Sequence, residues 1–258
     1  GITLAALVVY FLCDIKMTTL TIPFLGSIKL GWMSLPITVI WILAITNAVN
    51  LIDGLDGLAV GVAIIALTTS GIIGYLFLNV AGAYVSIMMF TLVASLLGFL
   101  PYNFHPAKIY LGDTGALFIG FMISVFSLSG LKNATFITLI IPVIILGVPI
   151  TDTVYAILRR FLNKRPISQA DKHHLHHRLM EIGLSHTQTV LVIYGIALIF
   201  SFIALLYPFS SVLGSILLTV ATLFGLELFV ESIGLVGTKR KPLINWIGRL
   251  FRVNHKKD

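Results

Sequence analysis

The stretch N-A-V-N-L-I-D-G-L-D-G, residues 47–57, places two asparagines and two aspartates between two long apolar segments. Two further polar stretches also interrupt apolar sequence. They are Y-N-F-H-P-A-K-I-Y-L-G-D-T-G at 102–115, and residues 159–186, which contain D-K-H-H-L-H-H-R-L at 171–179. Ionisable groups embedded in membrane-spanning sequence are costly and usually functional. These three stretches therefore direct both the assignment of the fold and the search for a site.

The composition of the chain is that of a membrane protein. Of its 258 residues, 58% are hydrophobic and 10% are charged, and the mean hydropathy is +1.03, whereas soluble domains average about 25% charged residues. Apolar runs of about 17–25 residues predict transmembrane helices. Such runs lie near 1–13, 35–49, 58–78, 82–101, 115–131, 135–157, 187–207 and 211–232. We therefore predict an all-α polytopic membrane protein with about eight transmembrane helices, forming a single domain over residues 1–258.

Eight spans place the three polar stretches and the C-terminal tail on one side of the membrane. That side carries 14 of the 17 lysines and arginines, and the other side carries Lys16, Lys29 and Lys132. Positive charge gathers on the cytoplasmic side of membrane proteins. We therefore expect a cytoplasmic His-rich loop at 159–186, a basic cytoplasmic tail at 235–258, and a site on the cytoplasmic face.

The opposite side carries β-branched and aromatic residues around Gly26 and Ser27. This pattern predicts a short external β-hairpin within residues 16–32, with a structural role. The single cysteine, Cys13, excludes an internal disulfide and a cysteine-based metal cluster.

The tail sequence G-T-K-R-K-P-L-I-N-W-I-G-R-L-F-R, residues 237–252, alternates basic and apolar groups. A basic amphipathic segment of this kind is typical of a helix that lies in the membrane interface and is attracted to anionic lipid. The net charge of +7 is explained by orientation and lipid attraction, and the residues give no support to nucleic-acid binding.

Asn50, Asp53 and Asp56 are spaced by three residues. On a helix they would fall within an arc of about 120° and could face one cavity. The glycines at 54 and 57 leave the backbone approachable, or let a helix end there. The simpler interpretation is a polar turn between two spans, in which Asn, Asp and Gly are ordinary residues.

In the second stretch, Asn103 precedes Asp113, and Gly112 and Gly115 flank the aspartate. The next apolar run begins directly after it, so we expect Asp113 at the N-terminus of a helix. There it could serve as a helix cap. A carboxylate beside glycines at a membrane surface also suits Mg²⁺, which prefers oxygen ligands and keeps water and substrate phosphates in its shell.

The third stretch contains four closely spaced histidines, which are His173, His174, His176 and His177. A zinc site is the obvious hypothesis for such a cluster, but neither a cysteine nor an H-E-x-x-H arrangement accompanies these histidines. Imidazoles beside Lys172 and Arg178 could instead bind phosphate oxygens. A His-rich loop without a function is the remaining alternative.

Together and in this order, the three stretches resemble the signatures of the polyprenyl-phosphate N-acetylhexosamine-1-phosphate transferases. The resemblance rests on N-A-V-N-L-I-D-G-L-D-G-L-A, H-P-A-K-I-Y-L-G-D-T-G and H-L-H-H-R-L. It extends over essentially the whole chain and is strongest for the branch that initiates teichoic acid synthesis in Gram-positive bacteria. The resemblance implies an enzyme of the bacterial plasma membrane.

The resemblance implies a transfer that depends on Mg²⁺, with Mn²⁺ as an alternative. A sugar 1-phosphate passes from a UDP-sugar, most simply UDP-GlcNAc, to undecaprenyl phosphate, and UMP is released. Asp113 would bind the metal and take part in catalysis with other carboxylates and imidazoles, and amides and an arginine would bind substrate. The further catalytic residues implied are Asp53, Asp56, His174, His176 and His177, and the substrate-binding residues implied are Asn47, Asn50, Asn103 and Arg178. His173 lies outside the H-x-H-H pattern, and a homodimer is left open.

The sequence departs from the family in one respect. The family carries an adjacent pair of aspartates in an earlier cytoplasmic loop, and no Asp-Asp pair occurs here. Because the chain begins at Gly1 and enters an apolar run at once, we expect the N-terminal part of the protein, including that loop, to be missing from this sequence.

Three alternatives stay open at this point. Within the family, the transferase that acts on UDP-MurNAc-pentapeptide tends towards three contiguous histidines, and H-L-H-H followed by Arg178 favours the UDP-GlcNAc branch. A transporter would place polar residues at mid-span and show inverted repeats, whereas here the polar residues cluster at span ends. A purely structural membrane subunit would need no such cluster.

Overall fold

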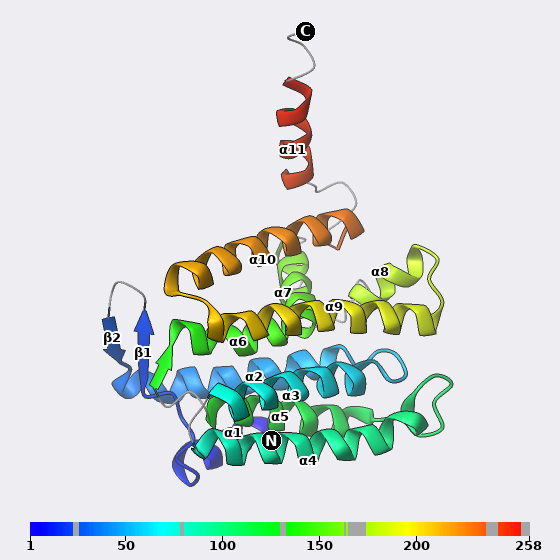
Figure 1. Cartoon of the computed structure of the whole chain (residues 1–258). Coiled ribbons are helices and arrows are strands. Elements are labelled where there is room, and N and C mark those ends of the chain that lie inside the picture. Colours follow the sequence, from blue (N-terminus) through cyan, green and yellow to red (C-terminus); the bar gives the residue numbers. More distant parts are fainter. Residues whose placement is uncertain are drawn as a thin grey trace.

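The computed structural model describes residues 1–22, 26–77, 80–129, 133–162, 164, 174–235 and 242–253 (Figure 1). Within these ranges, six helical segments are long and apolar enough to cross a membrane. They correspond to α2 (Ser34–Leu51), α3 (Leu58–Phe77), α4 (Val80–Asn103), α5 (Gly112–Ser129), α9 (His186–Leu206) and α10 (Val212–Ile233). Short 3₁₀ turns at Gly31–Met33 and Tyr207–Phe209 precede α2 and follow α9.

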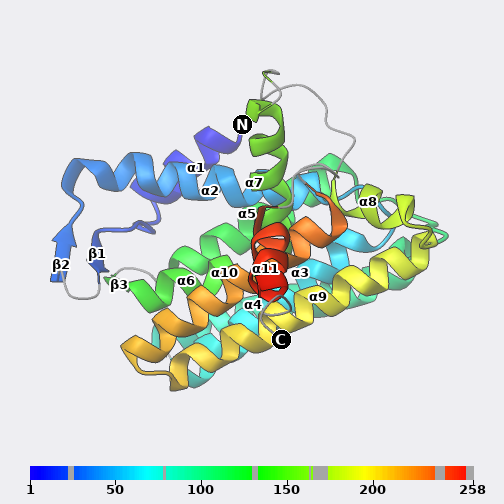
Figure 2. The same cartoon turned by 90° about the horizontal axis from the view of Figure 1, so that it is seen from above.

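The expectation of eight spans is not confirmed. The first expected span contains α1 (Ile2–Phe11), a helix of 10 residues. The span expected at 135–157 is divided at Leu146 into α6 (Phe136–Ile145) and α7 (Gly147–Leu162), and α7 runs across the direction of α6 (Figure 2). At the corner, Gly147 packs against Phe200, where a Cβ would meet the phenyl ring at 2.8 Å. A segment that is one apolar run in the sequence therefore forms two helices, with a glycine in close contact at the corner.

Local sequence explains where several helices begin and end. Ser185 and Gln188 form a capping box at the start of α9, because each side chain hydrogen-bonds to the backbone of the other. The hydroxyl of Ser211 accepts a hydrogen bond from Gly214 N at the start of α10. Helix α10 ends at Gly234, whose φ of 73° lies in the left-handed region that glycine tolerates.

The helices form two packed layers (Figure 1). In one layer, α2 packs on α5 and α3 packs on α4. Helices α9 and α6 lie over this layer, and α9 contacts α3. The main hydrophobic core lies between them and draws its fully buried side chains from α2, α3, α5 and α9, for example Val49, Val60, Ile119 and Ile193. This core is lined by apolar side chains, although some polar side chains, such as Asp152 on α7, are also buried.

The predicted hairpin is confirmed and gains a third strand. Strand β1 (Thr19–Ile22) pairs antiparallel with β2 (Gly26–Lys29), and Thr19 lies opposite Lys29. Strand β3 (Asn133–Thr135) pairs parallel with β1, so the order is β2-β1-β3. The contribution of β3 was not predicted from the sequence, since three residues between two spans carry little strand signal.

The connections α2–α3 and α4–α5 and the start of α9 lie at one end of the helices, and the sheet lies at the other (Figures 1 and 2). The first two polar stretches and the described residues 174–186 of the third therefore meet at one end, as predicted from the sequence, although the eight spans behind that prediction are not confirmed. The basic tail contains α11 (Pro242–Val253), which projects away from the helix layers. Its start is fixed by the buried carboxylate of Glu231, which accepts hydrogen bonds from Leu243 N and Ile244 N, both at 2.8 Å.

Candidate active site

A pocket of about 300 Å³ opens at the end of the helices where the polar stretches meet. It combines carboxylates from two stretches, one amide and one imidazole, and glycine backbone forms part of its wall. Its lining residues are Asp53, Gly54, Leu55, Asp56, Asn103, Tyr110, Leu111, Gly112, Asp113 and His186. Residues far apart in the sequence thus form one polar cavity at the edge of an apolar protein.

The two aspartates of the first stretch lie in a turn and not on a helix. Helix α2 ends at Leu51, and the turn is closed by hydrogen bonds from Asp53 N to Asn50 O at 3.1 Å and from Leu58 N to Leu55 O at 3.0 Å. The expectation that Asn50, Asp53 and Asp56 share a helical face is therefore wrong. Glycine is required at the end of this turn because Gly57 has φ of 79° and packs against Phe104.

Asn103, the last residue of α4, ties the first polar stretch to the second. Its Oδ1 accepts a hydrogen bond from Gly57 N at 3.2 Å, and its Nδ2 donates to Ile109 O at 3.0 Å. The side chain is buried, with 3% of its surface exposed. Both polar groups of this amide therefore hold loops together, so a role for Asn103 in substrate binding stays a prediction.

Asp113 lies in the first turn of α5, as predicted. A carboxylate at this position is favoured by the positive end of the helix dipole. Asn50 Nδ2 donates to Asp113 Oδ1 at 3.4 Å, which connects the first stretch to the helix start. The carboxylate of Asp113 is exposed towards the pocket that it shares with Asp53.

The pocket concentrates negative charge. Burial, the carboxylate of Asp113 and the carboxylate of Asp56 together raise the pKa of Asp53 from 3.8 to about 6. The carboxylates of Asp113 and Asp56 raise this pKa by electrostatic repulsion. Protonation of Asp53 removes one of the three negative charges and so relieves that repulsion. A cation placed among these groups would relieve the same repulsion.

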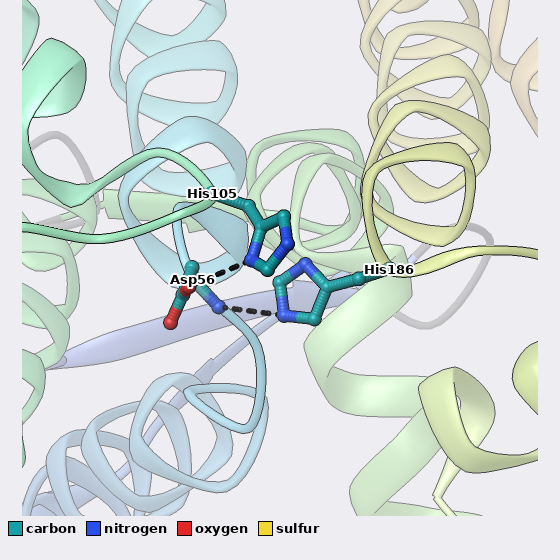
Figure 3. Close-up of side chains that lie close together, drawn as sticks. All are labelled: Asp56, His105 and His186. Carbon is teal, nitrogen blue, oxygen red and sulfur yellow. Dashed lines mark hydrogen bonds and ion pairs between the residues drawn. The ribbon is translucent and has the colours of Figure 1, made fainter.

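Asp56 also organises two histidines that the sequence interpretation did not select (Figure 3). His105 Nδ1 lies 3.0 Å from Asp56 Oδ2, and Ala107 N donates to the same oxygen at 3.1 Å. Asp56 N donates to His186 Nε2 at 3.3 Å, and the two imidazole rings stack with centroids 4.1 Å apart. The three side chains come from the three polar stretches, so this cluster is where those stretches join.

The Asp56 carboxylate is held ionised by these contacts. Burial acts to raise its pKa, but the hydrogen bonds from His105 and Ala107 N and the nearby imidazoles outweigh that effect and lower it. One ligand atom from each of Asp56, His105 and His186 lies within 4.8 Å of the others, a separation at which the cluster could hold a metal ion. His105 is the first residue of the sequence H-P-A-K, which looks like that of an ordinary loop histidine. Only the fold shows that it lies beside an aspartate.

The H-x-H-H histidines lie at the start of α8 (Leu175–Glu181), a helix that the sequence interpretation did not predict. His174 is the N-cap residue, and both His174 and His176 are buried. The rings of His176 and His177 have centroids 4.1 Å apart. His173, Asp171 and Lys172 lie outside the described residues.

His176 connects α8 to the pocket. A Cβ at Gly54 would lie 2.6 Å from both Cε1 and Nε2 of His176, so the imidazole rests directly against the turn between the two aspartates. Burial, with a further contribution from the neighbouring His177, lowers the pKa of His176 to about 4. His176 is therefore neutral at pH 7, and it packs against the turn as an uncharged ring.

Replacing Gly54 with Ala is expected to loosen α8. The added methyl group must displace the His176 ring, and overpacking of this kind costs about 1–3 kcal/mol. Hydrogen exchange of the amides at 175–181 should therefore be faster than in the unchanged protein. Gly98→Ala is a matched control because nothing lies within 4 Å of a Cβ at Gly98. Unchanged exchange in Gly54→Ala would contradict the contact.

Two predicted substrate-binding residues lie outside this pocket. Asn47 lines an apolar groove between α2 and α7, and its Nδ2 donates to Leu43 O at 2.7 Å. Arg178 lies on α8, and its Nη1 forms an ion pair with Glu181 Oε2 at 2.7 Å. The geometry thus brings together the three aspartates, Asn103 and the α8 histidines, and it leaves the binding roles of Asn47 and Arg178 as predictions.

The donor set of the pocket fits a hard divalent cation. Asp53 and Asp113 both line this pocket, whose lining residues include no lysine or arginine, and burial together with the neighbouring carboxylates raises the pKa of Asp53. Mg²⁺ takes oxygen ligands of this kind and usually binds through one or two carboxylates together with substrate phosphates. The arrangement can therefore bind a cation and an anionic substrate at a membrane surface.

Residues 1–131 match the sequence profile of glycosyl transferase family 4. The chain is 49% identical over 244 residues to a probable undecaprenyl-phosphate N-acetylglucosaminyl 1-phosphate transferase of Bacillus subtilis, covering 93% of this chain and 67% of that protein. The profile covers the first two polar stretches, and the alignment with the Bacillus protein covers most of the chain.

Two further relatives are more distant. A decaprenyl-phosphate N-acetylglucosaminephosphotransferase of Mycobacterium leprae is 36% identical over 178 residues, which are 62% of this chain and 45% of that protein. A phospho-N-acetylmuramoyl-pentapeptide-transferase of Clostridium beijerinckii is 35% identical over 198 residues, which are 73% of this chain and 57% of that protein. The chain thus spans about half the length of these two relatives.

Proposed function

The chain belongs to glycosyl transferase family 4, and on that premise we propose that it transfers N-acetylglucosamine 1-phosphate from UDP-N-acetylglucosamine to undecaprenyl phosphate, releasing UMP. The product would be the first lipid-linked intermediate of a cell-wall polymer of the teichoic acid type. The observation that carries the proposal is the pocket in which Asp53, Asp56 and Asp113 meet at one end of the apolar helices. A site there can receive a water-soluble nucleotide sugar and a phosphate whose lipid tail stays in the bilayer.

The proposed reaction needs positioning and neutralisation of charge more than covalent chemistry by the protein. Both reactants are anionic, and phosphoryl transfer is accelerated mainly by electrostatic stabilisation and alignment. Asp113 and Asp53 would hold a Mg²⁺ ion, or Mn²⁺ in its place. When bound, the ion would neutralise the diphosphate of the nucleotide sugar and assist departure of UMP.

Asp56, Asn103 and His176 hold the polar stretches in place around the pocket. Asp56 holds the second stretch through His105 and Ala107 and contacts the third through His186. Asn103 fixes the turn that presents the aspartates. The neutral His176 ring packs on Gly54 and keeps α8 beside the turn. Each of these contacts joins two of the three polar stretches, so the pocket depends on all of them.

Binding of Mg²⁺ is expected to release protons near pH 6 and not at pH 8. The pKa of Asp53 is raised to about 6, so its carboxyl group is largely protonated below pH 6 and ionised above it. A cation favours the ionised form, so binding should release about 0.5 proton per ion at pH 6 and close to none at pH 8. Isothermal titration calorimetry in two buffers of different ionisation enthalpy measures this number. Equal release at both pH values would contradict the assignment, and Asp53→Asn should remove the release at pH 6.

The choice of sugar is tested by offering two donors in parallel. The full-length gene product in nanodiscs receives undecaprenyl phosphate, Mg²⁺ and either UDP-GlcNAc or UDP-MurNAc-pentapeptide, and UMP release is measured. We expect turnover with UDP-GlcNAc alone, lost on chelation with EDTA. The second donor is included because the chain is also similar, at 35% identity, to the phospho-N-acetylmuramoyl-pentapeptide-transferase of Clostridium beijerinckii. Turnover restricted to UDP-MurNAc-pentapeptide would replace the proposed substrate.

We also propose that the pocket faces the cytoplasm and that the tail binds anionic lipid. The support for the first statement is the excess of lysine and arginine on the side of the polar stretches. The support for the second is α11, whose indole at Trp246 is 56% exposed in a segment rich in lysine and arginine. Interfacial helices commonly combine an aromatic anchor with basic groups.

A further inference from the structure

Asp152, on α7, is almost completely buried, with 1% of its surface exposed. Its two carboxylate oxygens have different partners. Oδ2 lies 2.8 Å from Nδ1 of His174, and Oδ1 accepts a hydrogen bond from Leu175 N at 2.8 Å. One buried carboxylate therefore holds both the N-cap residue and the first residue of the short helix that carries the H-x-H-H histidines.

The contact with His174 fixes the location of a proton. An ionised carboxylate only accepts hydrogen bonds, so the proton of the imidazole must reside on Nδ1. In the neutral ring, Nε2 is then left without a proton and can accept one or contact a cation. The hydrogen bond made by one ring nitrogen commonly determines what the other can do in this way.

The contact with Leu175 N fixes the position of α8. This helix has seven residues, and helices of this length depend on tertiary contacts for their stability. The carboxylate satisfies one of the amide groups that a helix start leaves unpaired. The ring of His176, the next residue, packs against Gly54 in the aspartate turn. Asp152 thus determines where the histidines stand relative to the pocket, although it does not line the pocket itself.

From these contacts we propose that Asp152 is the positioning residue of the H-x-H-H histidines, which holds His174 in the tautomer with its proton on Nδ1 and anchors α8 against the aspartate turn. The effect of Asp152 on turnover rests on the proposed function, but its pairing with His174 does not depend on that function. The histidines are then presented by a buried partner on another helix, and not by their own loop.

Asp152→Asn separates this role from simple helix capping. Asparagine has nearly the same shape, and its Oδ1 can still accept the hydrogen bond from Leu175 N, so a residue needed only as a cap should tolerate the change. Its Nδ2, however, would donate towards His174 Nδ1, which favours the opposite tautomer. Loss of such a hydrogen-bonding partner typically lowers activity by about 10- to 100-fold. We expect kcat for UMP release to fall within that range while the thermal midpoint stays close to that of the unchanged protein.

Ser211→Ala provides a matched control for loss of a helix cap. Its hydroxyl accepts a hydrogen bond from Gly214 N at the start of α10, at the opposite end of the molecule from the pocket (Figure 1). We expect this variant to lose some thermal stability and to keep its kcat. A kcat of Asp152→Asn within about twofold of the unchanged protein would overturn the proposal.

A second measurement needs neither a variant nor turnover. Nitrogen-15 NMR of histidine-labelled full-length protein, assigned with His174→Gln, reports the tautomer of His174 directly. A proton on Nδ1 supports the proposal, and a proton on Nε2 alone overturns it even if Asp152→Asn fails to fold. If the unchanged protein turns over neither donor while His174 carries its proton on Nδ1, the proposed function fails and the pairing of Asp152 with His174 stands.

Discussion

Replacing Asp113 with Asn should lower UMP release by about a thousandfold, the largest effect that we expect from a single substitution. The change keeps the shape of the side chain and its hydrogen bond from Asn50, but it removes one of the two carboxylates proposed to hold the cation. It also removes the repulsion that helps to raise the pKa of Asp53. The measurement is UMP release with saturating UDP-GlcNAc over a range of Mg²⁺ concentrations.

The control for this substitution is Asp14→Asn. Asp14 forms an ion pair with Lys16 at 2.7 Å, in the segment just before the β-sheet and thus at the far end of the helices from the pocket. We expect this variant to keep its activity. Near-normal turnover of Asp113→Asn at low Mg²⁺ would contradict the metal assignment, and equal losses in both variants would show that the effect is not specific to the pocket.

Replacing Asp56 with Ala is expected to lower kcat by about 100-fold, because it releases the second polar stretch from the first. The carboxylate binds His105 and Ala107 N at 3.0 and 3.1 Å. Small misplacements of catalytic groups can cost about a hundredfold in rate. Asp56→Asn should be less damaging, since its Oδ1 can still accept from Ala107 N while its interaction with His105 changes.

Measuring kcat and KM separately tests this explanation. If the stacked His105 and His186 depend on Asp56 for their placement, Asp56→Ala and the double variant Asp56→Ala/His105→Ala should have similar kcat values. A further large loss in the double variant would show that His105 acts independently of Asp56. A kcat of Asp56→Ala close to that of the unchanged protein would show that the cluster of Asp56, His105 and His186 is not needed for catalysis.

The sequence predicted that the polar residues gather at one end of the helices, although the eight spans from which this was argued are not confirmed. Asp113 at a helix start and the hairpin at the other end followed from local signals and were confirmed. The helical face proposed for Asn50, Asp53 and Asp56 was wrong, because α2 ends at Leu51. A three-residue spacing is equally compatible with a turn.

The remaining features depend on contacts between distant residues. His105 and His186 meet Asp56 across 49 and 130 positions, and no local pattern predicts that these three groups converge. Asp152 is visible in the sequence as an aspartate in an apolar span, but its partner His174 lies 22 positions further along the chain. The sixth expected span is divided at Leu146, next to Gly147, which packs on the distant Phe200. Composition reports hydrophobicity and cannot report a change in helix direction.

The central claim is that the phosphate attached to the sugar moves with the sugar to the lipid. It is tested most directly with UDP-GlcNAc labelled with phosphorus-32 at the phosphate next to the sugar, incubated with the full-length gene product, undecaprenyl phosphate and Mg²⁺. The account predicts that the label enters the organic phase while unlabelled UMP appears in the aqueous phase in equal amount. Label that stays in the aqueous phase as UDP, while the sugar moves to the lipid, would show transfer of the sugar alone and contradict the account.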